Sequence, residues 1–139
     1  MRVVLDTNVL ISALLFGGRL HFIVELLQHG ELTPCFSYRT WRELERTLNY
    51  PHLASALKKQ GVIKEQILEL LEVNSLLFPD ITSPLAVPHD PADEAILACA
   101  VAATAEAVVT GDKHLLLLRD FFTVPIFSPA EFKQWLAQH

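Results

Sequence analysis

Short apolar runs of strand length alternate with longer segments of helical periodicity along this 139-residue chain. The strand-like runs are residues 2–5, 32–36, 106–110 and 122–127. The helical segments are residues 9–18, 20–30, 38–49, 53–61, 63–77, 90–105, 113–118 and 128–138. Parallel strands need crossover connections, which are usually helices, so this alternation predicts a mainly parallel sheet with helices on both faces. We therefore expect an α/β fold, a three-layer α/β/α sandwich, formed by a single domain over residues 1–139.

Composition narrows the class of protein. The chain is 51% apolar and 19% charged, which favours a compact fold over a disordered tail. Asp6 breaks the apolar N-terminal stretch before it could serve as a secretory signal, and no run reaches the length of a membrane span. Cys35 and Cys99 lie far apart without a CxxC motif, as expected for reduced core thiols. We expect a cytoplasmic protein with no membrane partner.

Helix-capping signals mark several boundaries. Ser37 is expected to cap the helix at 38–49, and the residues from Ser128 to Glu131 form a capping box for the last helix. Asp90 precedes Pro91, which suits an N-cap followed by proline at the first helical position. The only proline-rich connection spans residues 78–91.

Acidic residues follow two of the predicted strands. Asp6 directly follows the strand at 2–5, and Asp112 stands just beyond the strand at 106–110. A charge between two apolar runs costs several kcal/mol if it is buried without a partner. We therefore expect either that the chain leaves the core at Asp6 or that another group compensates its charge. In parallel α/β sheets, sites form outside the carboxyl ends of the strands. Asp93, in the first turn of a helix, and Glu43, in the helix after residues 32–36, can reach the same edge, so these four acids can converge.

Four neighbouring carboxylates repel one another unless a cation is present. All-oxygen ligands favour Mg²⁺ or Mn²⁺ over Zn²⁺, and such a site suits hydrolysis of a phosphodiester. A bound divalent ion would also offset the formal charge of −5, which otherwise argues against a nucleic-acid binder. Three of these acids, and the neighbouring Asp90, also have a structural interpretation: Asp90 as a helix cap, Asp93 as a capping-box acid, Glu43 as a solvated residue and Asp112 as a turn residue. Asp6, between two apolar runs, is the exception for which a functional role is favoured.

Four stretches together resemble the PIN-domain nucleases, in particular the bacterial VapC-like toxin branch of toxin–antitoxin systems. They are VVLDTNVLISALL, SYRTWRELERTL, DPADEAILACAVAATAEAVVTGDKHLL and PIFSPAEF, and they span almost the whole chain in order. The resemblance implies an endoribonuclease with an acidic Mg²⁺ or Mn²⁺ site. It further implies two protein partners, a cognate antitoxin and a second copy of the chain in a homodimer.

The same resemblance assigns catalytic and metal-binding roles by position. The four family acids fall on Asp6, Glu43, Asp93 and Asp112. Supporting polar positions fall on Thr7 and Asn8, which would orient Asp6 or bind metal-bound water, and on Thr110, which would support Asp112. Glu94 follows the third acid, where it adds negative charge or faces solvent.

Basic residues near the acids are candidates for RNA binding. Arg39, Arg42 and Arg46 share one face of the helix that carries Glu43, and Lys113 follows Asp112. The three arginines could hold phosphates of an RNA, or they could form a solvated face or pair with Glu43 and Glu45. Lys113 could touch a phosphate or be only a polar residue of a turn.

Two other functions compete with a metal-dependent ribonuclease. The first is a catalytically silent interaction module that keeps the acids for metal or partner binding. The second is a phosphatase of the haloacid-dehalogenase type, whose motif also begins with an Asp after a strand. Asn8 stands where that motif has its second Asp, so the general acid of this mechanism is missing.

Overall fold

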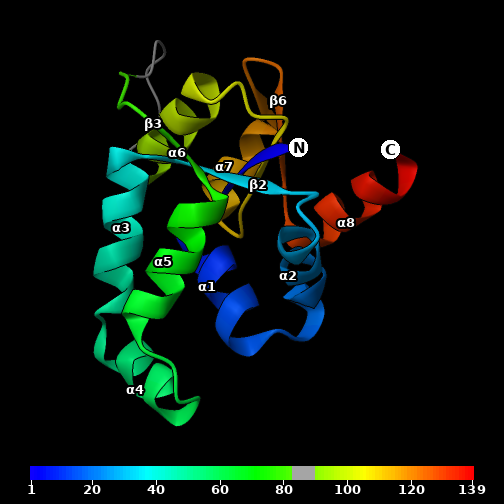
Figure 1. Ribbon diagram of the computed structural model, residues 1–139. Helices are drawn as coiled ribbons and strands as arrows, with labels where there is room; N and C mark the ends of the chain where they lie inside the picture. The colour runs from blue at the N-terminus through cyan, green and yellow to red at the C-terminus, as the bar shows by residue number, and fades with distance from the viewer. Residues whose placement is uncertain (83–89) are drawn as a thin grey trace.

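The computed structural model describes residues 1–82 and 90–139 (Figure 1). Half of the proline-rich connection expected at 78–91, residues 83–89, therefore lies outside the described residues. Within the described residues, six strands form one sheet in the order β3-β2-β1-β4-β6-β5. The strands are β1 (Arg2–Leu5), β2 (Thr33–Ser37), β3 (Leu76–Phe78), β4 (Ala107–Val109), β5 (Asp120–Phe121) and β6 (Val124–Phe127). Every neighbouring pair is parallel except β5 and β6, so the expected α/β fold with a mainly parallel sheet is confirmed.

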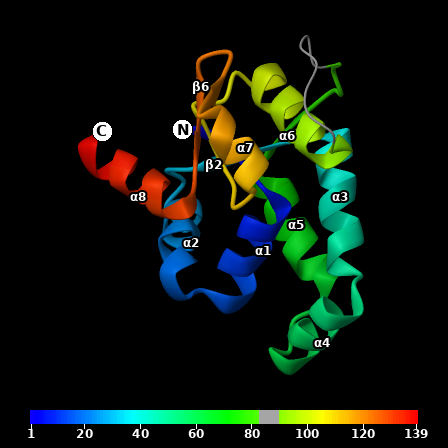
Figure 2. The ribbon, with the colours of Figure 1, turned by 180° about the vertical axis from the view of Figure 1, so that it is seen from behind.

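Helices connect the strands and flank the sheet. They are α1 (Thr7–Phe16), the short 3₁₀ helix η1 (Gly18–Leu20), α2 (His21–Gln28), α3 (Tyr38–Leu48), α4 (Pro51–Lys59), α5 (Lys64–Asn74), α6 (Pro91–Ala102), α7 (Lys113–Leu118) and α8 (Pro129–Gln138). Helices α6 and α7 stand in front when the molecule is viewed from behind (Figure 2). Among the described residues, no single helix is long and apolar enough to cross a membrane. The segments Thr7–Phe16 and Gly18–Gln28 pass that test only as a pair bent by 106°.

Two apolar clusters lie on opposite faces of the sheet because neighbouring strand residues point to opposite sides. Val3 and Leu5 of β1 join the larger cluster, which includes buried residues of α1 to α5 and α8. Val4, between them, joins the second cluster with residues of α6 and α7. The three layers therefore follow directly from the alternation within β1.

The sequence prediction was wrong for the third strand. Residues 63–77 were expected to form one helix, but α5 ends at Asn74 and β3 follows as an edge strand beside β2. A short leucine-rich run suits either a helix or a strand, and pairing with β2, remote in sequence, decides between them.

The last strand is also different from the prediction at 122–127. Strand β6 begins at Val124 and pairs antiparallel with β5. The two residues between them, Phe122 and Thr123, both have positive φ, which is the geometry of a tight hairpin turn. Neither residue is a glycine or asparagine, so the usual sequence signal for this turn is absent.

The expected caps and the reduced thiols are present. Ser37 accepts a hydrogen bond from Thr40 N at the start of α3, and Ser128 forms a capping box with Glu131 at the start of α8. Cys35 and Cys99 are buried and free. Burial raises the pKa of both thiols, that of Cys99 to about 12, so both stay protonated.

Candidate active site

Asp6 lies at the junction of β1 and α1, where hydrogen bonds compensate its charge. Its backbone N–H donates to Val109 O of β4 at 2.9 Å. One carboxylate oxygen caps α1 by accepting from Asn8 N at 3.2 Å, and the other accepts from the Thr110 hydroxyl at 2.7 Å. Helix α1 begins at Thr7 rather than at the expected Val9, because Asp6 itself is the cap.

Thr110 connects Asp6 to Asp112. The threonine is fully buried, and its oxygen accepts from the backbone N–H of Asp112 at 3.0 Å while it donates to Asp6. Asp112 then caps α7 by accepting from His114 N at 2.8 Å. One hydroxyl group thus fixes the positions of two acids that are 106 residues apart in sequence. The sequence predicted Thr110 as a support for the acids, and this contact is its physical basis.

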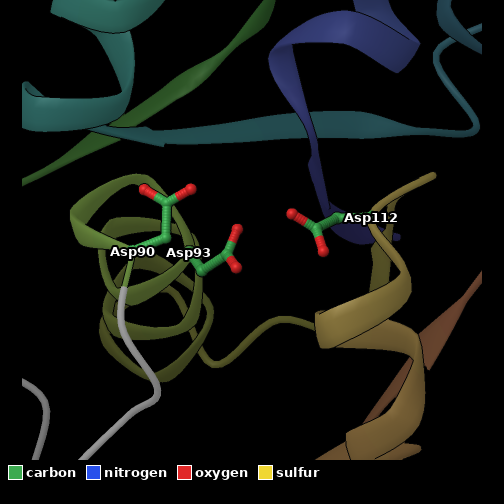
Figure 3. Close-up of side chains that lie close together, drawn as sticks. All are labelled: Asp90, Asp93 and Asp112. Atoms are coloured by element: carbon green, nitrogen blue, oxygen red, sulfur yellow. The ribbon is translucent and has the colours of Figure 1, made fainter.

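Asp90 and Asp93 lie at the start of α6. Asp90 caps the helix by accepting from Ala92 N at 2.9 Å, as predicted. Asp93 forms no capping box; it is only 5% exposed and points toward Asp112 (Figure 3). One carboxylate oxygen from each of Asp90, Asp93 and Asp112 lies within 4.8 Å of the others. We call these three residues the aspartate triad.

Crowding changes the acidity of Asp93. Its pKa is raised from 3.8 to about 6, first by burial, then by a hydrogen bond with Asp112 and by the charges of Asp112, Asp90 and Asp6. Each cause disfavours the ionised form, so a cation that neutralises these charges would favour it.

Glu43 lies beside this group but is held by other residues. Its Oε2 accepts from the Arg46 guanidinium at 3.0 Å, and its Oε1 accepts from the Thr47 hydroxyl at 3.5 Å. It lines the same cavity as Asp6 and the aspartate triad, yet its oxygens are not among those within 4.8 Å of one another.

Each of the three predicted arginines pairs with an acid outside the aspartate triad. Arg39 pairs with Glu94 and also donates to Pro91 O, and Arg42 lies 3.6 Å from Asp80. Arg46 pairs with Glu43, as the structural alternative foresaw. All three arginines still line the cavity. The structure thus shows the pairing with acids that one interpretation expects and leaves the arginines near the space that a phosphate would occupy.

The acids and arginines surround one open cavity of about 480 Å³ at the carboxyl edge of the sheet. It is lined by Asp6, Thr7, Asn8, Arg39, Thr40, Arg42, Glu43, Arg46, Asp90, Pro91, Ala92, Asp93, Ala95, Ile96 and Asp112. All four family acids and the polar pair after Asp6 are therefore brought together. Lys113 is exposed at the start of α7 and does not line this cavity.

A comparison with known protein families shows to which family the chain belongs. The PIN domain family matches residues 2–114, well over half of the chain. This chain belongs to the PIN domain family. No curated protein matches it. PIN domains are generally metal-dependent nucleases, and the acidic cavity is at the place where such an activity would reside.

The chemistry of this PIN domain's cavity fits a hard divalent cation. Its acidic donors are carboxylates, and Asp93 is a nearly buried carboxylate with a carboxylate oxygen of Asp112 within 4.8 Å of its own. Oxygen donors of this kind suit Mg²⁺ or Mn²⁺. Sequence reasoning treated Asp90 as a cap alone; the D-P-x-D spacing, which places two acids on the first turn of one helix, was the signal for its proximity to Asp93.

Proposed function

We propose that this PIN domain is a metal-dependent endoribonuclease that hydrolyses RNA phosphodiester bonds. The observation that carries the proposal is the arrangement of charge in the cavity. Arg39, Arg42 and Arg46 are paired with acids outside the aspartate triad, whereas within the described residues neither Asp6 nor the triad forms an ion pair. The negative charge of these aspartates is thus left for a cation.

Distinct groups of residues would share the work. Asp6, Asp93 and Asp112 would hold Mg²⁺ or Mn²⁺, and Glu43 lies near enough to contribute to the same cavity. When bound, the cation would stabilise charge on the phosphate oxygens and lower the pKa of an attacking water. Thr110 and the backbone N–H of Asn8 keep the carboxylate of Asp6 fixed. The arginines would orient the phosphates of the substrate.

The substitution Asp6→Asn provides the test. Asparagine keeps an oxygen for capping α1 but removes the charge. We expect the wild type to cleave a mixed RNA pool in Mg²⁺ or Mn²⁺, and EDTA and Asp6→Asn each to abolish cleavage. Glu69→Gln, which removes an exposed charge on α5, is the matched control and is expected to cleave normally. Cleavage that is indifferent to both EDTA and Asp6→Asn would contradict the proposal.

The biological role that we propose is that of a cytoplasmic toxin neutralised by an antitoxin. Induced expression in bacteria should arrest growth, and Asp6→Asn should relieve the arrest. Growth arrest that persists with Asp6→Asn would argue against a toxin that acts through this site. A short neighbouring gene whose product binds this chain and restores growth would identify the antitoxin.

We also propose that two copies form a homodimer. Helix α5 presents Leu70 and Val73 to solvent, 59% and 78% exposed, although Ile67 and Leu71 on the same helix are buried. Sedimentation of the wild type and of Val73→Glu tests this contact, because the charged side chain should dissociate the dimer. A wild type that sediments as a monomer would refute it.

The two competing functions predict different results. A silent interaction module would be stabilised by Mn²⁺ but would leave RNA intact. A phosphatase of the haloacid-dehalogenase type would hydrolyse simple phosphate esters through a phosphorylated Asp6. Asn8 stands where this phosphatase mechanism needs a general acid, and a side-chain amide cannot serve as one. The backbone N–H of Asn8 only donates a hydrogen bond to Asp6.

A further inference from the structure

We propose that Asp90 is itself a ligand of the cation and, by capping α6 at the same time, couples cation binding to the start of that helix. The inference rests on the metal-dependent function proposed above. It adds a ligand that the resemblance to known PIN domains does not supply, since the family acids fall on four other positions.

The first support is that only one of the two carboxylate oxygens of Asp90 is needed to cap the helix. Oδ1 accepts from Ala92 N at 2.9 Å and thereby caps α6. Among the described residues no other hydrogen bond or ion pair engages the Asp90 carboxylate, so its second oxygen is available. A carboxylate oxygen of Asp90 lies within 4.8 Å of ligand oxygens of both Asp93 and Asp112.

The second support is the burial of Asp93, which is independent of the clustering. This side chain is 5% exposed and points from α6 into the space that Asp90 and Asp112 flank (Figure 3). No basic side chain pairs with it among the described residues. A nearly buried carboxylate with this environment marks the position at which a cation would be most stabilising.

The third support is the comparison with Glu43. Oε2 of Glu43 accepts from the Arg46 guanidinium at 3.0 Å, so a basic side chain already offsets part of its charge. Within the described residues no basic side chain forms an ion pair with Asp90. Asp90 therefore offers more uncompensated negative charge to a cation at this end of the cavity than Glu43 does.

Two substitutions in the first turn of α6 separate ligation from capping. Asp90→Asn keeps the cap, because Asn caps helices about as well as Asp, but removes the charge. Glu94→Gln is the matched control, since Glu94 lies in the same turn but pairs with Arg39 instead of joining the aspartate triad. Both are made in the full chain, and Mn²⁺ alone is the probe, followed by calorimetric titration without RNA.

We expect Asp90→Asn to raise the Kd for Mn²⁺ at least about tenfold, comparable with or larger than the loss of an outer-shell partner. Its melting temperature in EDTA should equal or exceed that of the wild type, because the cap remains and a like charge is gone. Glu94→Gln should change the Kd less than about twofold, because the charge of Glu94 is already paired with Arg39 and lies outside the aspartate triad. Hydrogen exchange adds a readout of coupling: Mn²⁺ should slow exchange in the first turn of α6 in the wild type and much less in Asp90→Asn.

The outcomes distinguish this inference from the proposed function. If Asp90→Asn binds Mn²⁺ like the wild type while Asp6→Asn does not, the inference is overturned and the nuclease proposal stands. If Asp90→Asn and Glu94→Gln weaken binding equally, a general charge effect replaces direct ligation, and the inference is overturned. If Asp90→Asn alone weakens binding but the wild type leaves RNA intact, Asp90 is a ligand and the nuclease proposal fails. A wild type that binds no Mn²⁺ overturns both.

Discussion

Replacing Asp93 by Asn should make the metal-free protein more stable at neutral and alkaline pH. The substitution keeps the shape of the side chain and removes the charge. The pKa of Asp93 is raised from 3.8 to about 6, chiefly by burial and then by Asp112. At about 1.4 kcal/mol per pKa unit, this difference corresponds to about 3 kcal/mol of lost stability once the carboxylate is ionised.

The direction of the pH dependence follows from proton binding. Between about pH 4 and pH 6 the folded protein holds the proton of Asp93 more tightly than the unfolded chain does, so stability falls as pH rises. Below about pH 4 Asp93 is protonated in both states and destabilises neither. The advantage of Asp93→Asn should therefore be near zero at about pH 4 and reach about 3 kcal/mol above about pH 7.

Urea unfolding in EDTA across this pH range measures the difference. Glu69→Gln is again the control, because removing an exposed charge should change stability by less than about 0.5 kcal/mol at every pH. Mn²⁺ at about 1,000 times its Kd should reverse the order, since ligand at that concentration adds about 4.1 kcal/mol to a protein that binds it, more than the loss of about 3 kcal/mol through Asp93. If Asp93→Asn is no more stable than the wild type at about pH 8 in EDTA, the carboxylates do not repel as the structure indicates.

Two further substitutions test the neighbours of the aspartate triad. Thr110→Val removes a charge-assisted hydrogen bond to Asp6 and a second bond from Asp112, and it should lower the unfolding free energy by about 2 kcal/mol, measured by urea unfolding in EDTA. An unchanged midpoint would mean that this hydroxyl does not hold the acids together. Glu43→Gln should reduce RNA cleavage at least about tenfold in single-turnover assays, while the stabilisation by Mn²⁺ stays close to that of the wild type. If RNA cleavage and the stabilisation by Mn²⁺ were lost to the same extent, Glu43 would instead be a principal ligand of the cation. Its bond to Arg46 is largely exposed, so thermal melting of Glu43→Gln without metal should differ by less than about 1 kcal/mol.

Most of the fold was predictable because local physics decides it. Alternating strand and helix patterns gave the parallel sheet, and Ser37, Asp90 and Ser128 cap helices where their sequence context predicts. Strand β3 was not predictable in this way, because its three residues form a strand only through pairing with β2. The hairpin turn at Phe122 and Thr123 was not predictable either, because neither position has the glycine or asparagine that usually marks such a turn.

The site was predictable in position and less so in detail. Parallel strands bring Asp6 and Asp112 to the same edge whatever the side chains do, so their proximity follows from the fold. The partners of the arginines depend on side-chain directions across the two helices α3 and α6 and the loop that carries Asp80, and nothing in the local sequence gives them. Asp90 shows the limit most clearly: its cap was evident, but its approach to Asp112 depends on how α6 packs beside α7.

The separation of charges within one cavity links the fold to the proposed chemistry. Helix α3 supplies three arginines, and each is paired with an acid outside the aspartate triad: Glu94, Asp80 or Glu43. These pairs are partly exposed, so each contributes little to stability and can be exchanged for a phosphate at small cost. Asp93, by contrast, is buried among like charges, and its ionisation is unfavourable without a cation. The arrangement therefore favours a cation at the aspartate triad and an anion beside the arginines, which is the distribution of charge that a phosphodiester bound to a divalent ion requires.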